Sequence, residues 1–470
     1  MPSPKTRSPL GTRSTPGRSR SYVTALSLVL CSALSLLPTR SVRAQAPADH
    51  VVLVSIDGFR PEFYQERERP APTLQRMARG GVQADGVRGI FPSVTYPSHT
   101  TLVTGALPAA HGVYYNGVFD PEGETSGWYW DFDGITAETL WEAAGRRGLR
   151  TASIGWPVTV GAPIDYNLPE VWDPEGEWVA AVRRHTTPEG LFEEVEARAT
   201  GAMSGDMLSG QHNAREDRVG AIAAYLLQEY RPHLLTVHLV STDHAQHGHG
   251  RDHEEVDLAI AAVDRAVARM VEAADEAGIL GRTAFVITGD HGFTNVSARV
   301  SPNVWLVEAG LLEARPDRGD WRAAFQTAGG SAFLELRDPD DAAAADAVRA
   351  YLRELPQATQ RLFRVVEREE LDAVGANPRT PLALAGSPIV TMSGSSSGDA
   401  VAPASGGMHG HFPDLEDMET GLVAWGAGVR PGVRVSQVGL EDVAPLVAAL
   451  LGLRFEPADG MLVPGLLEGP

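Results

Sequence analysis

The sequence predicts an α/β fold with a mainly parallel central sheet, helices on both of its faces and an inserted cap subdomain. Apolar, β-branched runs at 51–56, 234–242 and 283–289 alternate with helical segments along the chain. Near-continuous apolar strands of this kind belong inside a parallel sheet that helices cover on both sides. The chain has 470 residues, of which 43% are hydrophobic, and this suffices for a large domain that carries insertions.

The first 44 residues predict a secretory signal peptide. They contain seven Lys and Arg residues and no acidic residue, and their apolar run from Tyr22 to Leu37 is short for a membrane span. We expect cleavage after Ala44, because cleavage after Ala46 would leave Pro47 at the start of the mature chain. We therefore expect a periplasmic or secreted protein, with an uncleaved N-terminal anchor as the alternative.

Composition and charge exclude several classes of protein. The formal net charge is −20, and it becomes −27 once residues 1–44 are removed, so we expect no general nucleic-acid-binding surface. The single cysteine, Cys31, lies in the signal segment, so the mature chain has neither disulfides nor thiolate metal sites. No later segment predicts a membrane span, and the oligomeric state is left open.

Helices and an insertion complete the predicted order of elements. Helical spacing of apolar residues predicts a helix over 256–277, and 442–451 predicts a second, buried helix. The stretch from about 302 to 395 differs in texture, with a short helix at 342–355, scattered strands and a Gly/Ser-rich piece. We predict that this stretch is an inserted subdomain of a catalytic domain spanning 45–470.

Three aspartates follow the apolar strands. Asp57, Asp243 and Asp290 each come directly after one of the three runs. Because ligands of open α/β sheets bind outside the carboxyl ends of the strands, we expect the three carboxylates to converge on one edge. Converging carboxylates repel each other unless cations lie between them, so the pattern predicts a cation site.

Histidines stand close to these aspartates. His247 lies four residues after Asp243, His291 directly follows Asp290, and His409 lies in the segment GGMHGH. Oxygen and nitrogen ligands together favour zinc, with other divalent transition metals as alternatives, over calcium or magnesium. Three aspartates, three histidines and a hydroxyl suffice for two metal sites. The remaining histidines of these segments are predicted to be surface or supporting residues: His244, His249, His253 and His411.

The segment 93–105, SVTYPSHTTLVTG, contains six hydroxyl side chains and is a candidate source of a nucleophile. Pro97 fits the first turn of a helix that Gly105 would end, so the hydroxyls from Ser98 to Thr104 have intrahelical or capping roles. Thr95 lies just before that helix, where the helix N-terminus favours anions. A metal-bound hydroxyl placed there can attack phosphorus. Spacing alone favours Thr95 over Ser93 only modestly.

In their order along the chain, these motifs resemble the nucleotide pyrophosphatase/phosphodiesterase family of the alkaline phosphatase superfamily. The similar segments are SIDGFRPEF, FPSVTYPSHTTLVTGALPAAHGVYYN, STDHAQHGHG, VITGDHGF and GGMHGHF, and they span almost the whole mature chain. The resemblance implies an alkaline-phosphatase-like sandwich and a bacterial, secreted type of member. The segment around His247 departs from the family, because it lacks the usual Gly before His247 and the Gly-Pro after it.

The resemblance also implies a role for each site residue. One zinc would be held by Asp243, His247 and His409. A second zinc would be held by Asp57, Asp290, His291 and the Thr95 hydroxyl. Thr95 would be the nucleophile and would form a phospho-threonine intermediate. Asn116 and the backbone N–H of Tyr96 would stabilise the transition-state charge, and the Tyr96 ring would contact the substrate. The implied substrate is a small phosphodiester or a nucleotide.

Three alternatives are weighed against this reading. A phosphomonoesterase or phosphonoacetate-type hydrolase on the same scaffold should place a cation against the extra phosphate charge, yet no Lys or Arg occurs between Arg88 and Arg146. A sulfatase needs Cys or Ser in a C/S-x-P-x-R pattern, whereas this chain has Thr95 and ends the pattern with His99. A non-catalytic metal-binding scaffold is disfavoured because all seven expected metal positions are filled.

Overall fold

The computed structural model describes residues 46–469 apart from 121–126, 174–176 and 314–319. The predicted signal peptide, residues 1–44, lies outside the described residues. Within the described part of the chain, no helix has the length and apolar character needed to cross a bilayer.

An eight-stranded sheet runs in the order β17-β2-β16-β6-β1-β5-β3-β4. Its centre consists of three fully buried strands, β1 (His50–Ile56), β5 (Leu234–Leu239) and β6 (Thr283–Thr288). β1 pairs in parallel with both of its neighbours, in a register that places Ser55 opposite His238 and opposite Thr288. Burial on both faces explains why these strands are almost wholly apolar.

The outer strands make the sheet mixed but mainly parallel. β3 (Thr151–Ile154) and β4 (Tyr166–Leu168) continue the parallel half beyond β5. On the other side, β16 (Leu422–Gly426) runs antiparallel to β6 and to β2 (Val82–Arg88), and β17 (Val433–Gly439) is parallel to β2. The predicted α/β fold class is confirmed.

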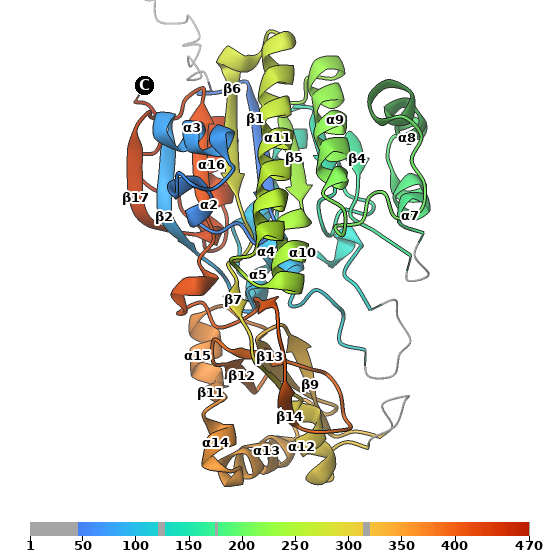
Figure 1. Cartoon of the computed structure of the whole chain (residues 1–470), viewed down its shortest axis with the longest axis vertical. Helices are drawn as coiled ribbons and strands as arrows, with labels where there is room; N and C mark the ends of the chain where they lie inside the picture. Colours follow the sequence, from blue (N-terminus) through green and yellow to red (C-terminus); the bar gives the residue numbers. More distant parts are fainter. Residues whose placement is uncertain (1–45, 121–126, 174–176, 314–319, 470) are drawn as a thin grey trace, which may run out of the picture. The chain divides into compact units, whose positions relative to one another are not determined.

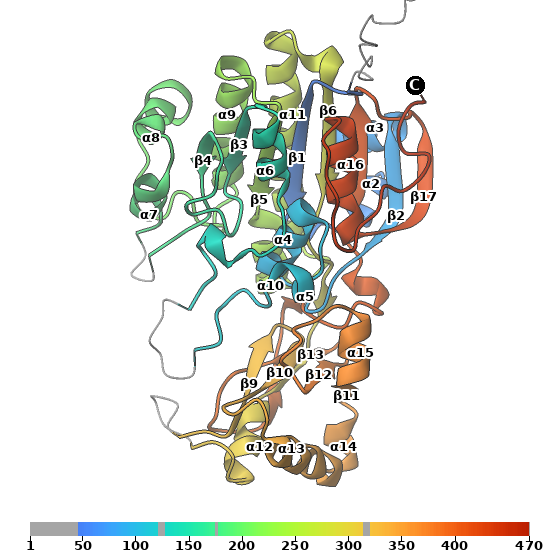
Figure 2. The same cartoon turned by 180° about the vertical axis from the view of Figure 1, so that it is seen from behind.

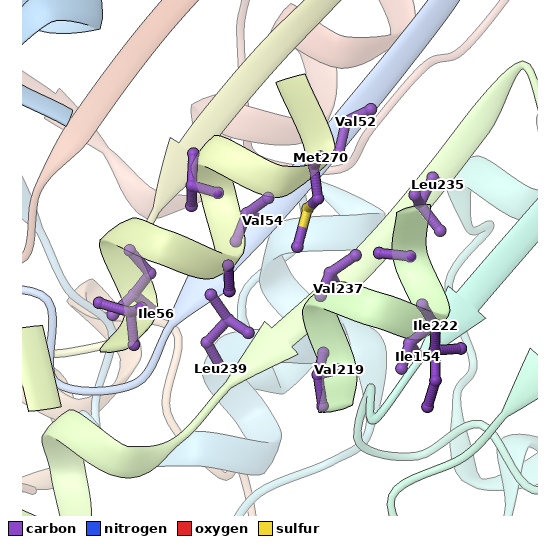
Figure 3. Packing of buried hydrophobic residues seen from close by; sticks show 14 of the residues in the cluster. Val52, Val54, Ile56, Ile154, Val219, Ile222, Leu235, Val237, Leu239 and Met270 are labelled. Atoms are coloured by element: carbon purple, nitrogen blue, oxygen red, sulfur yellow. The ribbon is translucent and has the colours of Figure 1, made fainter. Parts of the chain in front are cut away.

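Helices cover both faces of this sheet (Figure 1 and Figure 2). One face carries α3 (Pro72–Gly80), α9 (Ala214–Glu229) and α11 (Glu254–Glu276). The other carries α4 (Thr95–Thr104), α6 (Leu140–Arg146) and α16 (Val443–Leu450). Because side chains of a strand alternate between its faces, Val52, Val54 and Ile56 pack toward α9 and α11 (Figure 3), whereas Val51 and Leu53 belong to the opposite cluster.

A second, antiparallel sheet with the order β11-β12-β10-β9 has a core of its own. Its strands are β9 (Ala323–Ala328), β10 (Ser331–Leu336), β11 (Phe363–Glu367) and β12 (Leu382–Gly386). The helices α12 (Pro302–Glu308) and α13 (Ala342–Glu354) pack in the same core. A small sheet in the order β13-β8-β14 lies next to it, with strands Val390–Met392, Ala298–Val300 and Val401–Pro403. Two of these strands, β8 and β14, lie outside the bounds of about 302 and 395 that we expect for an inserted subdomain.

Short elements connect these parts. The remaining α-helices are α2 (Glu62–Gln65), α5 (Pro108–His111), α7 (Trp178–His185), α8 (Leu191–Val195), α10 (Ser241–His249), α14 (Gln357–Gln360) and α15 (Arg368–Ala373). A two-stranded ladder joins β7 (Thr294–Asn295) to β15 (Gly407–Met408). One-turn helices of other types lie at Phe132–Gly134, Glu196–Thr200, Leu280–Arg282, Glu416–Met418 and Leu440–Asp442.

Two element boundaries differ from the sequence prediction. The strand predicted over 234–242 ends at Leu239, and Asp243 lies in the first turn of α10 rather than at a strand end. The helix predicted after Pro97 begins at Thr95, so Thr95 belongs to its first turn. The predicted stop is correct, because Gly105 follows the helix with a φ of 60°, a conformation that favours glycine.

Candidate active site

The predicted ligands lie at the carboxyl end of the central sheet. Asp57 directly follows β1, and Asp290 and His291 come shortly after β6. Asp243 and His247 lie on α10, one helical turn apart, and His409 follows β15. Two groups of possible metal ligands form there, each with its ligand atoms within 4.8 Å of one another: Asp57, Asp290 and His291, and Asp243, His291 and His409.

The first group is a buried cluster whose facing atoms have no hydrogen-bond partner. Nε2 of His291 lies 3.2 Å from Oδ1 of Asp57 and 3.2 Å from Oδ2 of Asp290. All three atoms lack a hydrogen bond. Buried polar groups are normally paired, because leaving them unpaired costs free energy. A cation among these three atoms would supply the missing partner.

The other carboxylate oxygens of this cluster are held by the protein. Asp290 Oδ1 accepts hydrogen bonds from the backbone N–H groups of Gly58 and His291, each at 3.0 Å. Gly58 has a φ of +67°, and a Cβ there would lie 2.8 Å from Nε2 of Gln246, so this close approach requires glycine. Asp57 Oδ2 accepts a hydrogen bond from His238 Nε2 at 3.0 Å. Each aspartate therefore has one anchored oxygen and one oxygen that faces the cluster.

Charge in this cluster perturbs its proton equilibria. Burial, together with the charge of Asp57, raises the pKa of Asp290 to about 8. Burial alone would lower the pKa of His291, but Asp290 and Asp57 outweigh it and raise the pKa of His291 to about 9. Both shifts show that the pocket favours added positive charge, which a divalent ion provides.

The second group is built around Asp243. Its Oδ1 atom lacks a hydrogen bond and lies 3.2 Å from His247 Nε2 and 3.6 Å from His409 Nε2. The structure also brings His291 within reach of this group, and its ring stacks on that of His409 with centroids 3.5 Å apart. The family resemblance implies that His291 belongs to the Asp57 group alone. In this structure, His291 lies within reach of both groups.

The three histidines present the same ring nitrogen to the carboxylates. Each donates Nδ1–H to a backbone carbonyl: His247 to Gly407 at 3.1 Å, His291 to Gly292 at 3.1 Å and His409 to Ser93 at 3.0 Å. In the neutral ring this pattern fixes the proton on Nδ1 and leaves Nε2 free to bind a metal, as in most metal-ligating histidines. The turn between β9 and β10 also supports His409, because Gly330 N–H donates to its carbonyl at 2.7 Å. The residues present therefore fit two divalent metal ions.

Among the hydroxyls of 93–105, the structure places Thr95 at the cavity beside Asp57, Asp243 and His409. Ser93 is fully buried and donates its hydroxyl to the His411 carbonyl at 2.9 Å. The other threonines of the segment hydrogen-bond within the fold: Thr100 to Tyr96, Thr101 with His111, and Thr104 to Thr100. The structure thus distinguishes Thr95, which lines the cavity, from Ser93, which does not, whereas spacing alone favoured Thr95 only modestly.

Asn116 and Tyr96 meet beside Thr95. The Tyr96 N–H donates to Asn116 Oδ1 at 2.8 Å, so it is engaged within the protein rather than directed at a substrate. Because Oδ1 accepts that bond, the Nδ2 amide of Asn116 is left as its hydrogen-bond donor. Asn116 also lines the cavity. The Tyr96 ring packs against Trp128 with centroids 5.3 Å apart.

The cavity beside Thr95 has a volume of about 330 Å³. Its wall includes Trp128, Trp172 and Trp178, and Trp172 contacts both other rings at centroid distances of 4.5 and 4.8 Å. Such a wall offers flat apolar surface to a substrate group. The other histidines that were predicted to be surface or supporting residues differ in place. His244 is exposed and lines the cavity, His249 and His253 are exposed, and His411 is buried and bonded to the Val390 carbonyl.

Sequence reasoning missed three residues at this site. Arg215 lines the cavity although it lies far along the chain from Thr95, and its guanidinium bonds Glu216, the Leu208 carbonyl and the His238 carbonyl. Glu170 lines the same cavity. His238 is the next-to-last residue of β5, and a histidine within the apolar run LLTVHL was the one signal that could have found it.

Residues 51–411 match the sequence profile of the type I phosphodiesterase / nucleotide pyrophosphatase family. The chain belongs to this family. Human ectonucleotide pyrophosphatase/phosphodiesterase family member 1 is 23% identical over 434 residues, which cover 87% of this chain and 40% of the human protein. Mouse family member 7 is 27% identical over 459 residues, which cover 94% of this chain and 92% of the mouse protein. The chain thus spans less than half of one relative and almost all of the other.

Solved structures of the family share the fold. Human ectonucleotide pyrophosphatase/phosphodiesterase 5 gives a TM-score of 0.65 at 21% identity and covers 89% of this chain. The murine protein, as an inactive threonine-to-alanine variant in complex with AMP, gives a TM-score of 0.65 at 20% identity. The predicted family resemblance and the alkaline-phosphatase-like fold are both confirmed, and the family consists of phosphodiester and pyrophosphate hydrolases.

Proposed function

We propose that the chain is a secreted, two-zinc phosphodiesterase or nucleotide pyrophosphatase that works through a phospho-threonine intermediate. The observation that carries the proposal is the set of unpartnered ligand atoms beside Thr95: Oδ1 of Asp57, Oδ1 of Asp243, Oδ2 of Asp290 and Nε2 of His291. Membership of a family of phosphodiesterases supports the reaction class.

Two sets of residues would hold the metals. Asp57, Asp290, His291 and the Thr95 hydroxyl would bind one zinc, and Asp243, His247 and His409 the other. Bound zinc would lower the pKa of coordinated hydroxyl or water and offset the charge of the phosphoryl oxygens. Carboxylate oxygens mixed with imidazole nitrogens suit zinc, and other divalent transition metals are the alternative.

The chain's own residues would carry out an in-line displacement. Thr95 Oγ1 releases its proton to solvent water and attacks phosphorus. The bond from phosphorus to the leaving oxygen breaks on the opposite side, and the leaving oxygen takes up a proton from water. Because Thr95 lies in the first turn of α4, the helix dipole favours the negative phosphoryl group there. Asn116 Nδ2 would donate to a phosphoryl oxygen. Water then hydrolyses the phosphothreonine and regenerates Thr95.

The charges at the cavity favour a diester. A monoester carries an extra negative charge, which a free cationic side chain should meet. Among the described residues lining the cavity, Arg215 is the one Lys or Arg; it is 5% exposed and bonded to Glu216 and two carbonyls. The tryptophan wall offers room for an aromatic or apolar group. Since a murine relative was solved with AMP, we propose a nucleotide or a similar small phosphodiester as the substrate.

The decisive experiment replaces Thr95 with alanine. We expect Thr95→Ala to lose hydrolysis of bis-p-nitrophenyl phosphate by at least about 10³-fold while zinc content and thermal unfolding stay those of the wild type. Thr95→Ser is the matched control and should retain part of the activity. Hydrolysis that survives in a zinc-loaded Thr95→Ala protein would exclude the mechanism. A clear preference for mono-p-nitrophenyl phosphate would instead support the alternative, a phosphomonoesterase or phosphonoacetate-type hydrolase.

Two further features of the chain belong to the proposal. Export would remove residues 1–44, so the exported protein should begin at Gln45. An exported protein that begins at Pro47 or retains Met1 would contradict this cleavage site. The separate core of the second sheet supports the reading of about 302–395 as an inserted subdomain.

A further inference from the structure

His238 is a fully buried histidine between two carboxylates. Its Nε2–H donates to Asp57 Oδ2 at 3.0 Å, and its Nδ1–H donates to Glu170 Oε2 at 2.7 Å. The Gly155 carbonyl lies 3.0 Å from the same Nδ1 atom. Both ring nitrogens must carry a proton to satisfy both carboxylates, so this ring is a donor on both sides and cannot be a metal ligand.

The surrounding fold holds His238 firmly. His238 lies on β5 and is in register with Ser55 of the adjacent strand β1. Ser55 lies two residues before Asp57, which directly follows β1. The carbonyl of His238 accepts a hydrogen bond from Arg215 at 3.2 Å. Burial alone would lower the pKa of His238, but Glu170 and Asp57 outweigh it and raise the pKa of His238 to about 10.

Glu170 connects this histidine to the substrate cavity. It follows the edge strand β4 and lines the cavity together with Trp172, and its side chain is 13% exposed. The three side chains Glu170, His238 and Asp57 therefore form a continuous hydrogen-bonded row from the cavity wall to the Asp57 cluster. Neither Glu170 nor His238 belongs to a ligand set of the proposed metals.

We propose that His238, held by Glu170, is a positioning residue that fixes the Asp57 carboxylate with Oδ1 directed at the first metal. The proposal rests on the proposed function only in that the Asp57 cluster binds a metal. Without the bond from His238, Asp57 could rotate about its side chain and present either oxygen, or neither, to His291.

A positioning role predicts a selective defect. His238 contacts Asp57 and not Asp243, so its loss should weaken one metal site and spare the other. General damage to the fold would weaken both sites. Outer hydrogen-bond partners of metal ligands are typically worth about 10–100-fold in metal affinity.

The test is a zinc titration of chelator-treated protein, followed by calorimetry. We expect the wild type to bind two zinc ions, and His238→Phe to weaken one binding step by about 10–100-fold while the other step changes by less than about twofold. Glu170→Gln keeps the shape and an accepting oxygen, so it should weaken the same step by about twofold to tenfold. His111→Gln is the matched control, because His111 is a buried histidine bonded to Thr101, outside the row, and it should leave both steps unchanged.

Kinetics give a second readout. With bis-p-nitrophenyl phosphate, His238→Phe should lower kcat with little change in KM, and excess zinc should restore part of the loss. Equal weakening of both binding steps, or no weakening of either, would overturn the inference. If His238→Phe fails to fold by circular dichroism, Glu170→Gln decides, and an unchanged titration of that variant overturns the inference. A wild-type protein that binds no zinc would instead refute the proposed function.

Discussion

Asn116 offers a test in which the smaller side chain should be the less harmful one. Its Oδ1 accepts the Tyr96 N–H at 2.8 Å, which leaves Nδ2 as the donor for a phosphoryl oxygen. Asn116→Asp keeps an oxygen for Tyr96 but replaces the donor with a second, negatively charged oxygen. Asn116→Ala removes the same donor but also releases the Tyr96 N–H, which lies next to Thr95 and can then donate to the substrate.

The two losses can be estimated. Removing one preorganised donor to a developing anion costs about 10²–10³ in kcat, or roughly 3–4 kcal/mol. Asn116→Asp should lose this factor in full, and repulsion between its carboxylate and the phosphoryl oxygens adds to it. In Asn116→Ala the released N–H should recover about half of the free energy, which leaves a loss of about 10–30-fold.

The assay is the steady-state rate with bis-p-nitrophenyl phosphate at saturating zinc, with zinc content measured on each variant. We expect the wild type to be fastest, Asn116→Ala to be slower and Asn116→Asp to be slowest, with rates of the two variants that differ by at least about tenfold. Asn116→Asp as the faster variant, or equal rates for both, would show that Asn116 Nδ2 is not a donor to the reacting phosphate.

Three further outcomes follow from the buried charges. Removing zinc with a chelator should lower the midpoint of thermal unfolding by several degrees, since the carboxylates lose their counter-ions; an unchanged midpoint would argue against bound metal. Glu216 is fully buried and pairs with Arg215 at 3.2 Å while accepting the N–H groups of Val240 and Ser241, so Glu216→Ala should cost about 3–5 kcal/mol in urea unfolding, and a cost under about 1 kcal/mol would contradict this. Burial lowers the pKa of His111 from 6.5 to about 3, so the unfolded chain takes up this proton first. The contribution of neutral His111 to the free energy of unfolding is therefore complete above pH 6.5 and falls by about 1.4 kcal/mol per pH unit below it. His111→Gln should reduce this dependence of the free energy of unfolding on pH.

The parts of the site that were predictable lie next to strong local patterns. Asp57 and Asp290 follow short, mostly apolar strands, so their place at the sheet edge could be inferred from hydrophobic runs alone. Asp243 was predicted in the correct place for a partly wrong reason, because VST after Leu239 has strand-like composition but begins the turn into α10. Local composition does not fix where a strand ends when a helix follows at once.

The residues that were missed depend on contacts between distant segments. Glu170 and His238 are 68 positions apart, and His238 and Asp57 are 181 apart. Arg215 reaches the cavity because α9 packs beside β5, which no motif around Arg215 records. Such partners are set by the packing of the whole sheet, so the histidine within the apolar run of β5 is the one local sign of them in the sequence.

The turn between β9 and β10 changes how the second sheet should be regarded. Gly330 N–H holds the carbonyl of His409, and a Cβ at Gly330 would meet the His411 ring at 2.4 Å. This turn of the second sheet thus supports His409, a residue of the proposed metal site, while the sheet also has a core of its own. Shortening this part of the chain to obtain a minimal catalyst would remove the support beneath His409. Under the proposed function, we therefore expect that the segment carrying the second sheet cannot be exchanged as an independent module without loss of this support.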